Sequence, residues 1–243
     1  MEAKIEEYYS KFKKIYNQEN YPEWFEYFNS YNMDKGYGDK GYIEYEDGHE
    51  LGHYAILQNP LPKETKIILV GKNNSWFDET SMSNSLKIVK ELQDGIPSEN
   101  HITNKKSRYS KKLQEIFNEP ELNNLLMNHT LGMNRIWLQS GPSDSAIKDM
   151  KAPMIGTFIG SSLVDRCNQW TKEIIRIIKP EILILFGNKN DSNSAHKLFR
   201  EDEDEPFVIK HCYHPCNREK DGVSLVRKQI KDVLKKNGLL QRA

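Results

Sequence analysis

The chain has 243 residues, enough for one large domain with a substantial hydrophobic core. Its 35 Lys and Arg residues balance its 35 Asp and Glu residues, which excludes a histone-like polycation and an acidic tail protein but not a nucleic-acid enzyme with one basic face. No apolar run approaches the roughly 18 residues that a membrane span needs, the first residues have no apolar signal core, and three cysteines suggest no disulfide framework. We therefore expect no membrane partner and a reducing, cytoplasmic setting.

Residues 1–60 are rich in aromatic side chains and predict an extension packed on the core. Most of the chain's aromatic residues fall within 8–54. Their three- and four-residue spacing predicts two amphipathic helices, around 9–16 and 21–28. Glycines among tyrosines over 32–52 indicate loops or a short hairpin.

Residues 61–243 alternate apolar runs with segments of helical periodicity. The expected strands are Lys66–Val70, Leu131–Leu138, Ile182–Phe186 and Phe207–Ile209. The expected helices are Ser83–Leu92, Lys112–Met127, Ser162–Ile178 and Ser224–Leu234. Short runs rich in Ile and Val are typical of strands buried on both faces of a parallel sheet. The pattern predicts an α/β fold: a three-layer α/β/α sandwich with a central four-stranded, mainly parallel sheet, plus the mostly helical extension.

Polar and titratable residues follow each apolar run, where a parallel sheet binds its ligands. These segments are 71–77, 139–143, 187–190 and 211–218. The first lacks the Gly-Lys-Ser/Thr of a phosphate-binding P-loop. In the last, four His and Cys residues lie within six positions, too close in sequence to reach one tetrahedral metal easily. We expect no metal site.

Three segments at or near strand ends match the motifs of one enzyme family. Val70–Ser75 is similar to a strand followed by Gly-x-Asp/Asn-Pro-Tyr/Gly. His214–Asn217 is similar to His-Pro-Ser followed by a polar residue, and Cys167–Gly187 follows a helix, Lys-Pro, strand and Gly pattern. In order and spacing the set resembles the uracil-DNA glycosylase superfamily, over about residues 65–236.

The resemblance implies an enzyme that hydrolyses the bond between a flipped-out base and its deoxyribose. The transition state places negative charge on the departing base, so catalysis needs a positioned water and a donor near the base oxygen. Asn73 occupies the water-orienting position, with Asp78 as an alternative base or a helix N-cap, and His214 occupies the donor position. An amide cannot deprotonate water, which predicts a slower enzyme than relatives with Asp there. No lysine can be assigned to a lyase step, so the predicted enzyme is monofunctional.

Base recognition is assigned to Asn134, whose place on the second expected strand resembles that of the family's pyrimidine-binding Asn; its amide offers both a donor and an acceptor. An Asn bonded to loop backbone is the alternative. Trp76 or Phe77 supplies a stacking face, or packs in the core. The predicted substrate-binding residues are Gly71, Ser75, Trp76, Phe77, Asn134 and Asn217.

Two departures from the family pattern bear on the substrate. Asn74 replaces the motif proline, which leaves the loop less constrained. Ser75 replaces the tyrosine that abuts the pyrimidine C5 edge in strict uracil-specific members. The expected substrate is therefore uracil or a C5-modified pyrimidine, such as the hydroxymethylated or glucosylated cytosine of phage DNA, in base excision or anti-phage defence.

DNA is the expected partner, and it requires clustered positive charge. The predicted contacts are Lys105, Lys106, Arg108 and Lys111, with Arg218 as a candidate to fill the vacated duplex space; a solvated basic face is the alternative. The three cysteines fall short of an iron–sulfur ligand set, so no cofactor is expected, and no obligate protein partner is inferred. A noncatalytic nucleic-acid-binding module of the same fold and a small-molecule nucleotide hydrolase are the rival functions.

Overall fold

The computed structural model describes residues 1–18, 56–75, 95–105, 107–140, 158–188, 194–216 and 221–241. At its centre is a four-stranded sheet in which every strand pair is parallel. The strands are β1 (Ile67–Ser75), β2 (Thr130–Ser140), β3 (Ile182–Phe186) and β4 (Val208–Cys212), and their order across the sheet is β2-β1-β3-β4. The predicted α/β fold with a four-stranded parallel sheet is confirmed.

The central strands β1 and β3 are buried on both faces of the sheet. Ile67 and Leu69 of β1 join one hydrophobic cluster, whereas Ile68 and Val70 join the other. All five residues of β3 are buried. Because successive side chains of a strand point to opposite faces, a strand covered on both sides must be apolar throughout, which is why these two runs were visible in the sequence.

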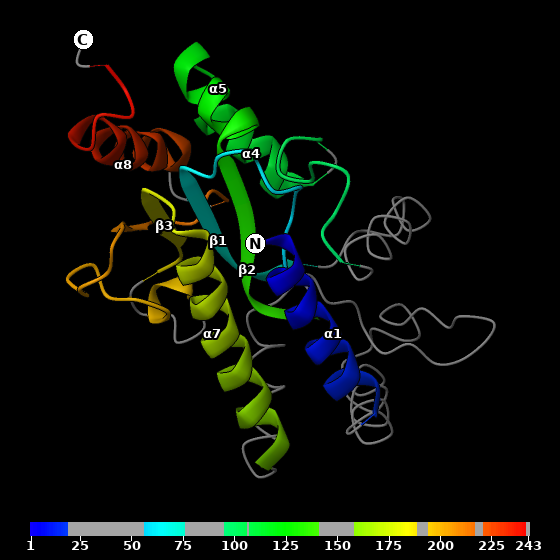
Figure 1. The fold of residues 1–243 in the computed structure, drawn as a ribbon. Helices are drawn as coiled ribbons and strands as arrows, with labels where there is room; N and C mark the ends of the chain where they lie inside the picture. The colour runs from blue at the N-terminus through cyan, green and yellow to red at the C-terminus, as the bar shows by residue number, and fades with distance from the viewer. Residues whose placement is uncertain are drawn as a thin grey trace, which may run out of the picture.

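One face of the sheet, the α4 face, is covered by three helices: α4 (Arg108–Ile116), α5 (Pro120–Asn128) and α8 (Gly222–Lys236) (Figure 1). Helix α4 begins at a capping box. The Ser107 hydroxyl accepts a hydrogen bond from the Ser110 N–H, and the Ser110 hydroxyl accepts one from the Ser107 N–H. The predicted helix at Ser224–Leu234 is confirmed as α8.

The single helix expected at Lys112–Met127 is wrong, because α4 and α5 are separate helices. Helix α4 ends before Phe117, and Pro120 opens α5 at its first turn. Glu119, the residue before Pro120, is extended, with φ −74° and ψ 144°. Proline disfavours helical backbone in the preceding residue and has no N–H to donate, so the chain breaks the helix here and starts another.

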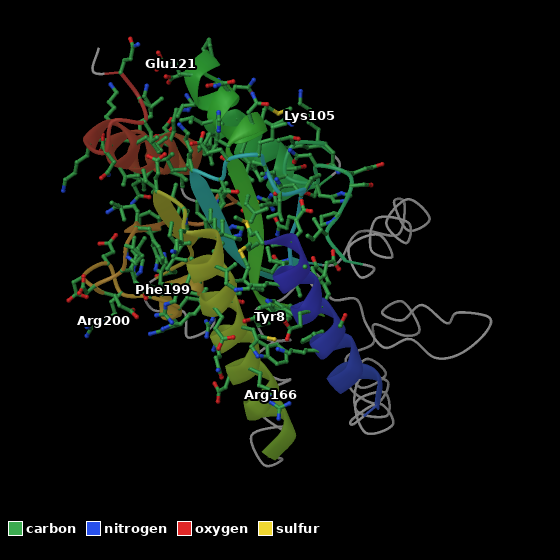
Figure 2. All side chains as sticks on the ribbon, viewed as in Figure 1. Tyr8, Lys105, Glu121, Arg166, Phe199 and Arg200 are labelled. Carbon is green, nitrogen blue, oxygen red and sulfur yellow. The ribbon has the colours of Figure 1, made fainter. Side chains whose placement is uncertain are left out.

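The opposite face, the α7 face, is covered by α7 (Phe158–Ile178), α1 (Glu2–Gln18) and the short 3₁₀ helix η3 (Ala195–Lys197) (Figure 1). Helices α1 and α7 lie side by side, and the Tyr8 hydroxyl of α1 donates to Glu173 of α7 at 2.7 Å (Figure 2). Phe12 is fully buried and packs edge-on against Trp137 at 5.1 Å between ring centroids. The first predicted N-terminal helix and the predicted helix at 162–178 are confirmed.

Several predictions from the sequence fall outside the described residues. These are the second N-terminal helix at 21–28, the loops at 32–52 and the helix at Ser83–Leu92. The last residues of the predicted extension are described, and they pair with the outer side of β2. Leu57 forms an antiparallel bridge with Met133 of β2, and the N–H of Gln58 donates to the carbonyl of Gly132 at 2.8 Å.

Strand β1 is longer than the sequence indicates. The loop expected at 71–75 continues the strand: Gly71 pairs with Asn134, Asn73 with Ile136 and Ser75 with Ser140, with a register shift between Asn73 and Ser75. Glycine and asparagine have poor strand propensity, which is why a loop was predicted. Pairing with β2 overrides that local preference.

The order of the strands identifies where a ligand would bind. β1 leads through α4 and α5 on one face to β2, and β2 returns through α7 on the other face to β3, which lies beside β1. The connection after β1 contains α4 and α5 on one face, and the connection from β3 to β4 contains η3 on the other face. In sheets whose neighbouring strands β1 and β3 continue in this way, ligands occupy the crevice outside the carboxyl ends of those strands. None of the described helices has the length and apolar character that crossing a membrane requires.

Candidate functional site

Asn134 and Gly71 lie side by side within β2 and β1, level with the carboxyl ends of β3 and β4. They are paired in register, and a Cβ on Gly71 would stand 3.8 Å from the Asn134 Oδ1. Asn134 is fully buried. Its neighbour Met133 joins the cluster on the α7 face, so strand alternation directs Asn134 to the α4 face.

Gln58 fixes the Asn134 amide. The Gln58 Nε2 donates to the Asn134 Oδ1 at 2.7 Å, and the Asn134 backbone N–H donates to the Ile56 carbonyl at 3.1 Å. No strand-like pattern in the sequence around Gln58 indicates this role. These bonds fit a prepositioned recognition amide and also the alternative of an Asn that serves the protein's own bonding.

His214 lies two residues beyond β4, in the predicted histidine loop. Pro215 is buried and holds φ near its fixed value. The Cys216 backbone N–H donates to the His214 Nδ1 at 3.1 Å. A nitrogen that accepts a hydrogen bond carries a lone pair, so the neutral imidazole has its proton on Nε2. His214 is therefore held as an Nε2–H donor.

Tyr109, in the first turn of α4, connects the histidine loop to the end of β3. Its ring centroid lies 5.8 Å from that of His214, tilted by 39°, and 6.4 Å from that of Phe186 in an edge-on arrangement. Phe186 is the last residue of β3. In the sequence, Tyr109 stands among basic residues. Its contact with His214 spans two distant segments, so no local pattern could have shown it.

Asn134 and His214 lie toward the same end and on the same face of the sheet. Asn134 is on β2, whereas His214 follows β4, three strand positions away. With strands about 4.8 Å apart, the two backbones are separated by roughly 14 Å. The rings of Tyr109 and Phe186 lie in the interval between them.

The cysteine thiols near this edge are poor nucleophiles. Burial raises the pKa of Cys212 to about 12, and burial also raises the pKa of Cys216. The nucleophile is the thiolate, so both groups are protonated and unreactive at neutral pH. His211 belongs elsewhere: it faces the α7 side, where its ring stacks on His196 at 4.3 Å. Within the described ranges, no three His, Cys, Asp or Glu side chains are grouped to hold a metal ion.

Three predicted DNA contacts lie at the α4 end of the molecule. Lys105, Arg108 and Lys111 are all exposed, and Figure 2 shows Lys105 beside α4 on the side away from α7. The positive charge of Arg108 acts on the thiol of Cys216, so this basic surface adjoins the histidine loop. The predicted contacts Lys106 and Arg218 lie outside the described residues.

The residues predicted to orient the water and to stack on the base lie partly or wholly outside the described part of the chain. The backbones of Asn73 and Ser75 belong to β1, whereas their side chains fall outside the description. Trp76, Phe77 and Asn217 fall outside it entirely, as does Asp78. These roles stay predictions.

No protein-family model matches the chain, and no curated protein matches its sequence. The resemblance to the uracil-DNA glycosylase superfamily therefore rests on the motifs at 70–75, 167–187 and 214–217 and stays a prediction.

Proposed function

We propose that the protein is a monofunctional DNA glycosylase that hydrolyses the N-glycosidic bond of a flipped-out pyrimidine. The observation that carries the proposal is the orientation of His214. Its Nδ1 accepts the Cys216 N–H, which leaves a proton on Nε2, at the same edge and face of the sheet as the buried amide of Asn134. A fixed donor at one end and a fixed amide at the other suit a base that leaves as an anion.

The chemistry divides among three residues. As the glycosidic bond breaks, the base takes the electron pair, and the His214 Nε2–H stabilises the charge that develops on a base oxygen. Asn73 orients the water that attacks the sugar carbon, and the proton that this water loses ends on the departed base anion, which completes the hydrolysis. Asn134 binds the base edge, where the donor and acceptor of an amide match a pyrimidine. Preorganised donors of this kind lower the barrier because they need no reorientation during the reaction.

The proposed substrate is DNA that contains uracil or a C5-modified pyrimidine. Ser75 stands where strict uracil-specific relatives have a tyrosine, and a small side chain leaves room for a C5 substituent. Lys105, Arg108 and Lys111 supply an exposed basic surface beside the histidine loop for phosphate contacts. Which base the enzyme releases decides whether it acts in base excision repair or in anti-phage defence. The proposal places the enzyme in the cytoplasm.

Strand scission after alkali tests the proposal, because alkali cleaves DNA at each abasic site. Labelled duplexes with one uracil or one modified cytosine are incubated with the wild type, Asn73→Ala, Asn134→Ala and His214→Ala. We expect His214→Ala to slow scission by about 10²- to 10³-fold, as for loss of one donor to a developing anion. The expected loss for each asparagine is about tenfold or more.

His129→Ala is the matched control. His129 precedes β2 at the opposite edge of the sheet, where its Nδ1 approaches Glu64, so its removal should leave scission unchanged. Variants as active as the wild type would show that the site residues are misassigned. DNA binding without scission on any base would favour the noncatalytic module.

A further inference from the structure

The Tyr109 hydroxyl is buried and has no hydrogen-bond partner in the part of the chain that the structure describes. The ring itself is partly exposed and packs between Phe186 and His214. The neighbouring polar groups of α4 are satisfied. The Ser110 hydroxyl, one residue on, both accepts from the Ser107 N–H and donates to the Ser107 carbonyl at 3.0 Å.

An unpaired buried hydroxyl is costly, so it needs an explanation. The oxygen is shielded from bulk solvent. A phenylalanine would fill the same space against Phe186 without this cost. A hydrogen bond to a bound ligand would offset the cost of the buried hydroxyl.

The state of the hydroxyl says which partner it lacks. Burial raises the pKa of Tyr109 far above its usual value, so the group carries its proton at any physiological pH. A protonated phenol has a hydrogen to donate. Its ring neighbours the imidazole of His214, the donor of the proposed site.

We infer that Tyr109 is a base-binding residue, whose hydroxyl donates a hydrogen bond to a carbonyl oxygen or ring nitrogen of the same base that His214 faces. The inference rests on the proposed function and adds a third fixed group to it. A pyrimidine base has carbonyl oxygens or a ring nitrogen that can accept this hydrogen bond. A site that holds a buried donor discriminates strongly against ligands that cannot pair with it.

Tyr109→Phe tests the inference because it removes one oxygen and keeps the ring. We expect kcat/KM for base release to fall roughly tenfold. Affinity for DNA with the target base should fall by a similar factor, whereas affinity for the same DNA with an abasic site should not change. In the absence of DNA, Tm should stay the same or rise by about 2–4 °C, because an unpaired buried group has been removed.

Tyr8→Phe is the matched control, since the Tyr8 hydroxyl has a protein partner in Glu173. The Tyr8→Phe variant should have a lower Tm than the wild type and the same kcat/KM for base release. Tyr109→Phe with wild-type kinetics, or with a lower Tm, would overturn the inference while the loss of activity in His214→Ala still supported the proposed function. A wild type that releases no base would contradict the proposed function itself, and the role of Tyr109 with it.

Discussion

At the scale of single residues, the bond between Cys216 and His214 decides what the imidazole can do. A backbone N–H has a fixed direction, so it selects the ring state in which Nδ1 carries a lone pair. In the neutral ring the proton is then on Nε2, which suits stabilisation of a base anion by hydrogen bonding.

A second histidine gives the protein a stability that depends on pH. His196 stacks on His211, donates from Nε2 to the Cys212 carbonyl at 3.0 Å, and has a buried Nδ1 without a partner among the described residues. Burial lowers the pKa of His196 below its ordinary 6.5, and the adjacent His211 adds to this effect. Below about pH 6.5, His196 binds a proton in the unfolded chain but not in the folded chain. The free energy of unfolding is therefore highest above about pH 6.5 and falls as the pH drops below it.

Urea unfolding of the wild type and His196→Gln between pH 8 and pH 5 measures this effect. We expect the wild type to lose stability below pH 6.5 and His196→Gln to lose less. The nearby Glu201 titrates in a lower range. Burial acts to raise its pKa, but the His211 N–H and Lys210 outweigh burial and lower it below 4.5. Parallel pH curves for the two proteins would contradict the assignment to His196.

At the scale of elements, both edges of the sheet are protected. Edge strands expose backbone groups that can pair with other chains. Residues 56–59 cover the edge of β2 with backbone bonds. Along β4, the Glu201 carboxylate accepts the His211 N–H at 2.7 Å, and the Gln229 side chain accepts the Tyr213 N–H at 3.1 Å.

Asn59 provides the test of the β2 edge. It is buried, its Nδ2 donates to the Thr130 carbonyl at 2.9 Å, and its Oδ1 accepts the Gly132 N–H at 2.7 Å. Asn59→Ala leaves both backbone groups unpaired in the interior, and we expect a loss of about 2–4 kcal/mol of unfolding free energy. Urea denaturation measures it.

Asn128→Ala is the control for that experiment. Asn128 is exposed on α5, and its side chain bonds only the Asn124 side chain among the described residues. Its loss should cost less than about 0.5 kcal/mol. Equal losses for the two variants would show that the 56–59 segment does not hold the sheet edge.

Elements with one strong local signal were predictable from the sequence, and those set by distant pairing were not. β3 and α7 carry continuous apolar or helical patterns, and both were found. The extension of β1 through Asn73 depends on the partner Ile136, 63 positions away in the numbering, and a polar sequence gave no sign of it. The break before α5 was marked by Pro120, and the apolar periodicity on both sides concealed it.

At the scale of the whole molecule, the candidate site is made by topology. Because the strands are parallel, the residues near Gly71 on β1 and those that follow β4 lie at the same end of the sheet, although 143 positions separate Gly71 from His214. Asn134 and His214 were predicted from the resemblance to family motifs. The rule that ligands bind beyond the carboxyl ends of strands agrees with the place of His214 after β4, whereas Asn134 lies within β2. The same rule said nothing of Gln58 or Tyr109, because their contributions come from segments that pack over the edge rather than from strand ends.

Mass spectrometry of free bases tests the central claim most directly. Wild-type protein and His214→Ala are incubated with DNAs that contain uracil, hydroxymethylated cytosine or glucosylated cytosine, and the small molecules released are identified by mass. We predict a free pyrimidine from at least one of these DNAs with the wild type, and release slowed by at least about 10²-fold with the folded variant. The absence of any released base from all of them, with folded wild-type protein, would contradict the account.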